Sequence, residues 1–186
     1  MAARSSGSGI GKFLLGLILG LLLIPVGAYL YFRFGKPPVA AADVPLSFER
    51  EMVSIPLRAR IDREAPKAAP FGESEDAFEG GAQVYRQNCA SCHGVPGHSV
   101  PYGKLMFPHA PQLWAAHKKH GTGPSVTGVS DDPIGETYWK VANGIRLSGM
   151  PAYNTLLSDT QMWQVSILLK NADQPLPDPV EKILTK

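Results

Sequence analysis

The sequence predicts an all-α protein in which one small helical domain follows a single transmembrane helix. Three observations support this fold class. Residues 13–32 form an uncharged run of twenty residues rich in Leu and Ile. Further along the chain, three segments place apolar residues at helical spacing between start and stop signals. No segment alternates apolar and polar residues convincingly enough to predict a sheet.

Composition narrows the class of protein. With 44% hydrophobic and 18% charged residues, the 186-residue chain is close to the globular average, which argues against disorder along most of it. Residues 1–73 carry nine Lys or Arg against six Asp or Glu, whereas residues 74–173 carry seven against eight. The net charge of +2 therefore belongs to the N-terminal third, and no nucleic-acid partner is expected. Two cysteines are too few for a disulfide scaffold.

The uncharged run predicts a membrane anchor over residues 1–35. A helix of twenty residues is about 30 Å long, the thickness of a bilayer hydrocarbon core. Its end carries residues typical of a membrane interface, namely Tyr29, Tyr31 and Phe32, followed by Arg33.

A signal peptide cleaved after Ala28 is the alternative, because Val26 and Ala28 suit the cleavage positions. The apolar run continues to Phe32 and then stops at charges, which favours a retained anchor. Positive charges lie on both sides of the run, so their count does not orient it.

Two segments are rich in proline. Residues 36–73 contain six prolines and are predicted to be an extended linker, which would reach on the order of 100 Å if fully polyproline-like. Short strands or a helical turn over residues 48–63 stay open. Residues 174–186 are predicted to be a second loose segment, a C-terminal tail.

The first helix of the domain is expected over residues 75–88. Ser74 is a suitable N-cap, and Gly81, Val84 and Tyr85 share one face. The second is expected over residues 133–143, with Asp132 as its cap. The third is expected over residues 159–170, where Ser158 and Gln161 have the spacing of a capping box.

The segment between the first two helices is unusually long. Residues 94–131 contain six glycines and five prolines, with room for one short helix after Pro111. A loop of this length counts against a compact domain. It is compatible with one only if something other than polypeptide fills the core.

The motif Cys89-Ala90-Ser91-Cys92-His93 indicates which group could fill the core. Two thiols three residues apart can add to the two vinyl groups of a haem, and the adjacent histidine can then reach the iron. Two other readings are weaker. A redox dithiol needs a βαβ context, and a zinc site that uses His117 and His120 leaves His93 without a role.

Residues 74–173 resemble a class I c-type cytochrome. Cys89 and Cys92 match the thioether positions of that family and His93 its proximal iron ligand. Met150, in the turn Gly-Met-Pro-Ala-Tyr, matches the sixth ligand. The resemblance implies a small helical domain wrapped around one covalent haem c. It also implies that Gly81 and Tyr85 pack on the last helix near Trp163, and that a proline carbonyl orients His93, either that of Pro111 or that of Pro108.

The sixth ligand can also be argued from the residues themselves. Met150 stands in a turn restricted by Pro151, so little entropy is lost on ligation. Met162 and Met106 are better explained as packing residues. His109, His117 or His120, or an open coordination site, remain alternatives. Trp139 and Arg146 flank the turn and suit either haem-propionate contacts or ordinary structural roles.

The resemblance implies electron transfer without enzyme activity, because His and Met ligands saturate the iron. The expected protein is a membrane-tethered carrier, or a subunit of a respiratory or photosynthetic complex. Its expected partners are membrane-bound redox complexes or other cytochromes, with no small-molecule substrate. Haem c attachment in bacterial family members places the domain on the periplasmic side of the cytoplasmic membrane, with the N-terminus inside. The alternative function is a haem enzyme such as a peroxidase, or a gas sensor.

Overall fold

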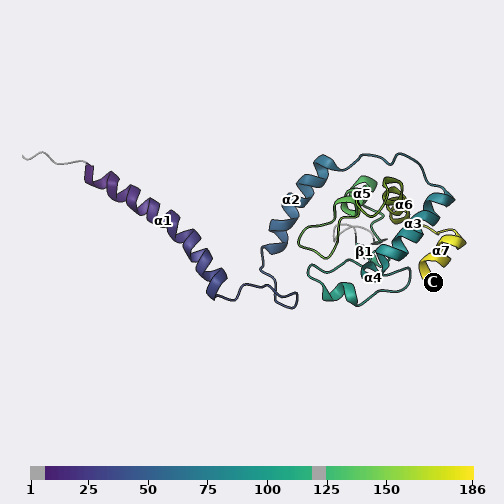
Figure 1. The fold of residues 1–186 in the computed structure, drawn as a ribbon, viewed down its shortest axis with the longest axis horizontal. Coiled ribbons are helices and arrows are strands. Elements are labelled where there is room, and N and C mark those ends of the chain that lie inside the picture. Colours follow the sequence, from purple (N-terminus) through teal and green to yellow (C-terminus); the bar gives the residue numbers. More distant parts are fainter. Residues whose placement is uncertain (1–6, 119–124) are drawn as a thin grey trace, which may run out of the picture. The chain divides into compact units, whose positions relative to one another are not determined.

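The structure is a computed structural model, and it describes residues 7–118 and 125–186. The chain divides into two units, Met1–Pro45 and Leu46–Lys186. From residue 7 onward, the first unit contains one helix, α1 (Gly7–Phe34), which Figure 1 shows as a single continuous rod. Within it, Gly9–Phe34 is long and apolar enough to cross a membrane. The predicted N-terminal apolar helix is therefore present.

The second unit is helical, as the sequence predicted. Its described residues form the helices α2 (Glu49–Glu64), α3 (Glu75–Asn88), α4 (Ala90–His93), α5 (Ile134–Asn143), α6 (Asp159–Lys170) and α7 (Asp178–Thr185), and a 3₁₀ turn at Tyr102–Leu105. The strands β1 (Ala116–Lys118) and β2 (Ser125–Thr127) form a short antiparallel hairpin that the sequence did not predict. With three residues in each strand, the hairpin is too short to show an alternating pattern.

Helices α3 and α6 pack against each other and position the rest of the domain (Figure 1). Gly81 lets the two backbones approach closely, because a Cβ there would overlap the carbonyl of Gln164. The Leu168 side chain also lies against this position. Tyr85 is fully buried on the same face of α3, as expected. Trp163 is also buried and stacks on the Tyr138 ring, 4.0 Å between centroids.

Local capping signals fixed the ends of two helices. Helix α3 begins after Ser74, whose hydroxyl accepts a hydrogen bond from the Ala77 amide (3.2 Å). Helix α6 begins after Ser158 and carries the complete capping box with Gln161.

The expected cap of the second helix was wrong. Helix α5 begins after Pro133, and Asp132 does not cap it. The carboxylate of Asp132 instead pairs with the Lys140 ammonium at 3.0 Å. Aspartate at this position is a common N-cap, but here the ion pair with Lys140 uses the carboxylate that would cap the helix.

The prediction of an extended linker over residues 36–73 was wrong in its middle part, where a helical turn over residues 48–63 had been left open. Helix α2 occupies Glu49–Glu64, because Pro56 is the only proline between Pro45 and Pro66 and most neighbouring residues favour helix. Tertiary contacts add to this preference. Ile61 is buried, and the Trp139 indole of α5 donates a hydrogen bond to Glu64 (3.0 Å).

The C-terminal segment is not loose. Pro179 stands in the first turn of α7, where proline costs little because its missing N–H would be unpaired there. Val180 and Leu184, four residues apart, are fully buried in the same core as α3. The proline-rich stretch is therefore the entry to a packed helix.

Candidate haem-binding site

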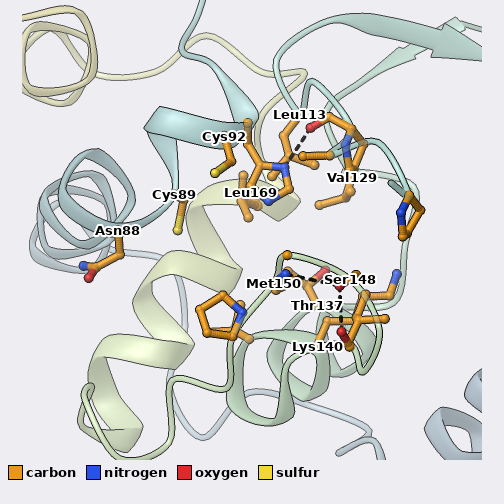
Figure 2. Close-up of a pocket in the computed structure, with 18 of the residues that line it drawn as sticks. Asn88, Cys89, Cys92, Leu113, Val129, Thr137, Lys140, Ser148, Met150 and Leu169 are labelled. Carbon is orange, nitrogen blue, oxygen red and sulfur yellow. Dashed lines mark hydrogen bonds between the residues drawn. The ribbon is translucent and has the colours of Figure 1, made fainter. Parts of the chain in front are cut away.

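A cavity lies between α3, α5, α6 and the irregular chain that follows α4. It encloses about 1070 Å³, including its open mouth, and its walls are mostly apolar. Cys89, Cys92, His93 and Met150 all line it. Figure 2 shows Cys89 and Cys92 on one side of the cavity, with Thr137 and Lys140 on another. The four residues that the sequence singled out are thus brought to one space.

The two cysteines are placed by the junction of two helices. Helix α3 ends at Asn88, and α4 starts at Ala90 with Cys89 as its N-cap, so positions 89 and 92 share a helical face. Both thiols are free. Burial raises the pKa of the Cys89 thiol to about 12, with a smaller contribution from the neighbouring Cys92. This side of the cavity is therefore apolar enough to receive the edge of a large hydrophobic ring.

His93 is oriented by a backbone carbonyl. Its Nδ1 lies 2.7 Å from the carbonyl oxygen of Pro111, and because a carbonyl only accepts, Nδ1 carries the proton. That tautomer leaves the Nε2 lone pair available for a metal. Burial lowers the pKa of His93, and the bond to Pro111 offsets this only in part. Of the two prolines considered from the sequence, Pro111 is the partner of His93.

Gln112 ties the same loop to the CxxCH segment, a role that no sequence pattern indicated. Its Nε2 donates to the Cys92 carbonyl (3.0 Å), and its Oε1 accepts from the Val100 amide (2.8 Å). The Leu113 amide donates to the His93 carbonyl (3.1 Å). The long irregular loop is therefore fixed to α4 at several points.

The turn that carries Met150 is held by local hydrogen bonds. The Ile145 amide donates to the Met150 carbonyl (3.2 Å), and the Met150 amide donates to the Ser148 hydroxyl (3.1 Å). Gly144, with φ of 65°, ends α5 at the predicted boundary after Asn143. Downstream, the Tyr153 hydroxyl donates to the Asn88 carbonyl (2.9 Å), which connects the turn to the end of α3.

The residues considered as alternatives to Met150 for the sixth iron ligand lie in different parts of the domain. Met106 and His109 line the same cavity as Met150. Met162 is buried in the helical core. His117 is exposed and lies 3.5 Å from the Asp131 carboxylate. His120, a candidate in both the zinc and the bis-histidine readings, lies outside the described residues.

The alternative chemistries gain no support from the described part of the chain. There, no three His, Cys, Asp or Glu side chains gather into a group that could hold a metal ion. Cys89 and Cys92 lie at a helix–helix junction and not in a βαβ unit. The indole N–H of Trp139 is bonded to Glu64, which supports a structural role for that residue, and Arg146 is exposed.

Polar residues on the α5 side of the cavity were missed by sequence reasoning. Lys140 lines the cavity and pairs with Glu136 (2.7 Å) and Asp132 (3.0 Å). Burial lowers the pKa of Lys140, but the hydrogen bonds and charges of the two carboxylates outweigh it and raise the pKa overall. A lysine with acidic residues four and eight positions before it is typical of an exposed helix face. Its place in the cavity wall therefore becomes evident only from the fold.

Comparison with known families agrees with the geometry. The family model described as cytochrome c oxidase, cbb3-type, subunit III matches residues 76–167, just under half of the chain. A search of curated proteins found no match. The match indicates that residues 76–167 form a c-type cytochrome domain, consistent with the class I monohaem type. Members of this family bind haem c covalently and transfer electrons with it.

The residues present fit that group. The cavity is apolar, two free thiols face it from one side, and a histidine nitrogen without a proton is available beside them. A thioether from Met150 is available in the same space.

Proposed function

We propose that this protein is a membrane-tethered electron carrier in which Cys89 and Cys92 hold one haem c and His93 and Met150 bind its iron. One observation carries the proposal: four residues separated by up to 61 positions line a single apolar cavity. The haem would supply a single one-electron couple, ferric to ferrous. Everything else follows from how the chain holds it.

Each side chain has a defined task. The two cysteines would hold the ring edge through thioether bonds, which would prevent loss of the cofactor. Pro111 keeps the proton of His93 on Nδ1, so that Nε2 stays a ligand. Met150 offers a soft sulfur that favours the ferrous state and raises the reduction potential. The apolar walls exclude water and lower the local dielectric constant.

His93 and Met150 would supply two ligands from the protein and would leave no open position on the iron. Oxygen and peroxide then have no place to bind, so the proposed role is electron transfer and not oxidation of a substrate. The domain between residues 74 and 173 is close to neutral, with seven basic and eight acidic residues. Docking to a redox partner would then depend more on apolar contact than on charge steering.

The anchor sets the location. Haem c is attached outside the cytoplasmic membrane in bacterial members of the family, so the domain would be periplasmic and the N-terminus cytoplasmic. Residues 1–35 would be the retained anchor, and residues 74–173 the haem-bearing part. The matching family description names subunit III of a cbb3-type oxidase. A terminal oxidase complex of that type is the partner that we propose, with this chain as a subunit or as its electron donor.

The ferric optical spectrum of the purified full-length protein tests the proposal. Methionine sulfur bound to ferric haem gives a weak charge-transfer band, and we expect that band together with slow binding of cyanide. An absent band with rapid binding of cyanide or carbon monoxide would indicate an open site, as in a haem enzyme or a gas sensor. Intact mass gives the haem number and shows whether residues up to about Ala28 are retained.

A further inference from the structure

We propose that Met106 is a positioning residue for Met150: it packs on Gly149 and so holds the sixth-ligand turn against the cavity. The inference rests on the proposed function, because it takes Met150 to be an iron ligand. Its consequence is that one irregular loop positions both axial ligands, His93 through Pro111 and Met150 through Met106.

The first observation is the contact between Met106 and Gly149. A Cβ built on Gly149 would overlap the Cε methyl of Met106 and would lie 3.4 Å from its Sδ. Apart from Ser148 and Met150, the chain neighbours of Gly149, Met106 is the only described residue with atoms within 4 Å of that position. Because residue 149 is a glycine, the tip of Met106 occupies the space that a side chain at this position would fill. Residue 149 is adjacent to the proposed ligand.

The second observation is that the backbone beneath Met106 is fixed. The Met106 carbonyl oxygen lies 2.7 Å from Nδ1 of His109, and the Ala110 amide donates to the Gly103 carbonyl (2.9 Å). Pro111, five residues after Met106, holds His93. A methionine tip that extends from such a restrained loop can restrict what it touches, because little of the contact is lost to motion of its own backbone.

The third observation is that the hydrogen bonds around Met150 are mostly internal to the turn. Ile145 and Ser148 bond to Met150, and both belong to the same turn. Leu147 at its tip is 81% exposed and has φ of 61°, a conformation that non-glycine residues rarely adopt. Internal bonds preserve the shape of a turn, and the bonds from Tyr153 that tie this turn to α3 and α5 lie three residues after Met150. Met106 supplies a contact from the opposite loop.

Methionine suits this task. Its unbranched chain reaches across a gap, and its thioether adapts to a flat backbone surface. Met106 also lines the cavity, as do Gly149 and Met150. If the contact is removed, the turn should move away from the iron more often, and an added ligand should replace Met150 more readily.

Imidazole is a suitable probe, because it competes with a methionine ligand for ferric iron. We expect Met106→Ala in the full chain to bind imidazole on the order of tenfold more tightly than the wild type. Loss of a half-buried methionine contact is worth about 1.4 kcal/mol, which is that factor of ten. Leu105→Ala is the matched control, since the neighbouring side chain is 74% exposed and should leave imidazole affinity unchanged. Met106→Leu should restore most of the wild-type behaviour, because bulk and not sulfur is required.

A reciprocal variant tests the contact itself. Gly149→Ala should also raise imidazole affinity, because its Cβ displaces the Met106 tip. In the Met106→Ala background the same change should have almost no effect, since the obstructing atoms are gone. Equal effects of Gly149→Ala in both backgrounds would overturn the proposed contact.

The outcomes separate this inference from the proposed function. If the wild-type protein lacks the methionine charge-transfer band, the ligation itself is wrong. If the band is present but Met106→Ala and Leu105→Ala both leave imidazole affinity unchanged, only the positioning role is wrong. If Met150→Ala keeps the band and the double variant Met106→Ala/Met150→Ala loses it, Met106 is itself a ligand, and the positioning role is overturned. Far-UV circular dichroism of each variant confirms that it folds.

Discussion

The two sides of the cavity are built in different ways. On the His93 side, both cysteines and the histidine belong to five consecutive residues, and backbone and Gln112 hydrogen bonds tie that segment to the loop that follows. On the Met150 side, a turn with mostly internal hydrogen bonds is contacted by a methionine tip from another loop. The first arrangement is local in sequence, and the second exists only in the fold.

This difference matters for ligand exchange. Hydrogen bonds to fixed backbone atoms specify the direction of a side chain, so the histidine should stay bound in both oxidation states. A turn held by packing can move with less loss of free energy. The Met150 side is therefore expected to be the side that opens.

The largest effect is expected from His93→Ala. Because both cysteines remain, haem should still be attached, but the iron should lose its proximal nitrogen and become high-spin. Optical spectra of the purified variant report the spin state. A low-spin spectrum that is indistinguishable from wild type would mean that another residue is the proximal ligand.

Met150→Ala should have the next largest effect. The haem should stay covalently bound and the reduction potential should fall by on the order of 0.1 V, because the soft ligand is gone. Carbon monoxide should then bind the ferrous form rapidly. Redox titration measures the potential, and an unchanged value would move the sixth ligand to another residue, with Met106 and His109 as the candidates that line the cavity.

Leu184 lies away from both proposed iron ligands. Leu184→Ala should therefore lower global stability without affecting one side of the cavity more than the other. Leu184 is fully buried in the core beside α3, so the expected cost is about 3 kcal/mol. Lys182→Ala, on the exposed face of α7, is the control and should cost little. Chemical denaturation followed by circular dichroism gives both values. Equal stabilities would show that α7 does not pack in solution as described.

The smallest effect concerns the contact between α2 and α5. Hydrogen bonds from Arg60 and then from Trp139 lower the pKa of Glu64 below its usual 4.5. Because the pKa of Glu64 is lower in the folded state, its ionised carboxylate stabilises the fold above pH 4.5. This stabilisation is lost as the pH falls through the lower pKa of the folded state. Glu64→Gln keeps an acceptor for the indole but has no charge to lose, so its stability should fall less steeply in acid. Parallel pH–stability curves would contradict this.

The sequence predicted what is encoded locally. Ser74, Ser158 and Gln161 marked helix ends because caps act within one turn, and the CxxCH motif is contiguous. For α2 a helical turn over residues 48–63 was only left open, and α7 was missed, because the prolines of both segments were taken as signs of loose chain. Pro179 stands in a first helical turn, and Pro56 interrupts a helix that Ile61 and Trp139 help to hold.

The remaining features depend on tertiary contacts. Loop length could not decide between Pro108 and Pro111, because the path of residues 94–111 determines which carbonyl meets His93. Nothing in the sequence pairs Met106 with Gly149, 43 positions apart, since a glycine that accommodates a distant side chain resembles any other glycine.

Proton NMR of the reduced protein tests the central claim most directly. A methionine bound to diamagnetic haem iron has its methyl resonance shifted far upfield by the ring current. The account predicts one such three-proton signal in the wild type, its loss in Met150→Ala and its retention in Met106→Ala. The absence of the signal from the wild type, or its persistence in Met150→Ala, would contradict ligation by Met150.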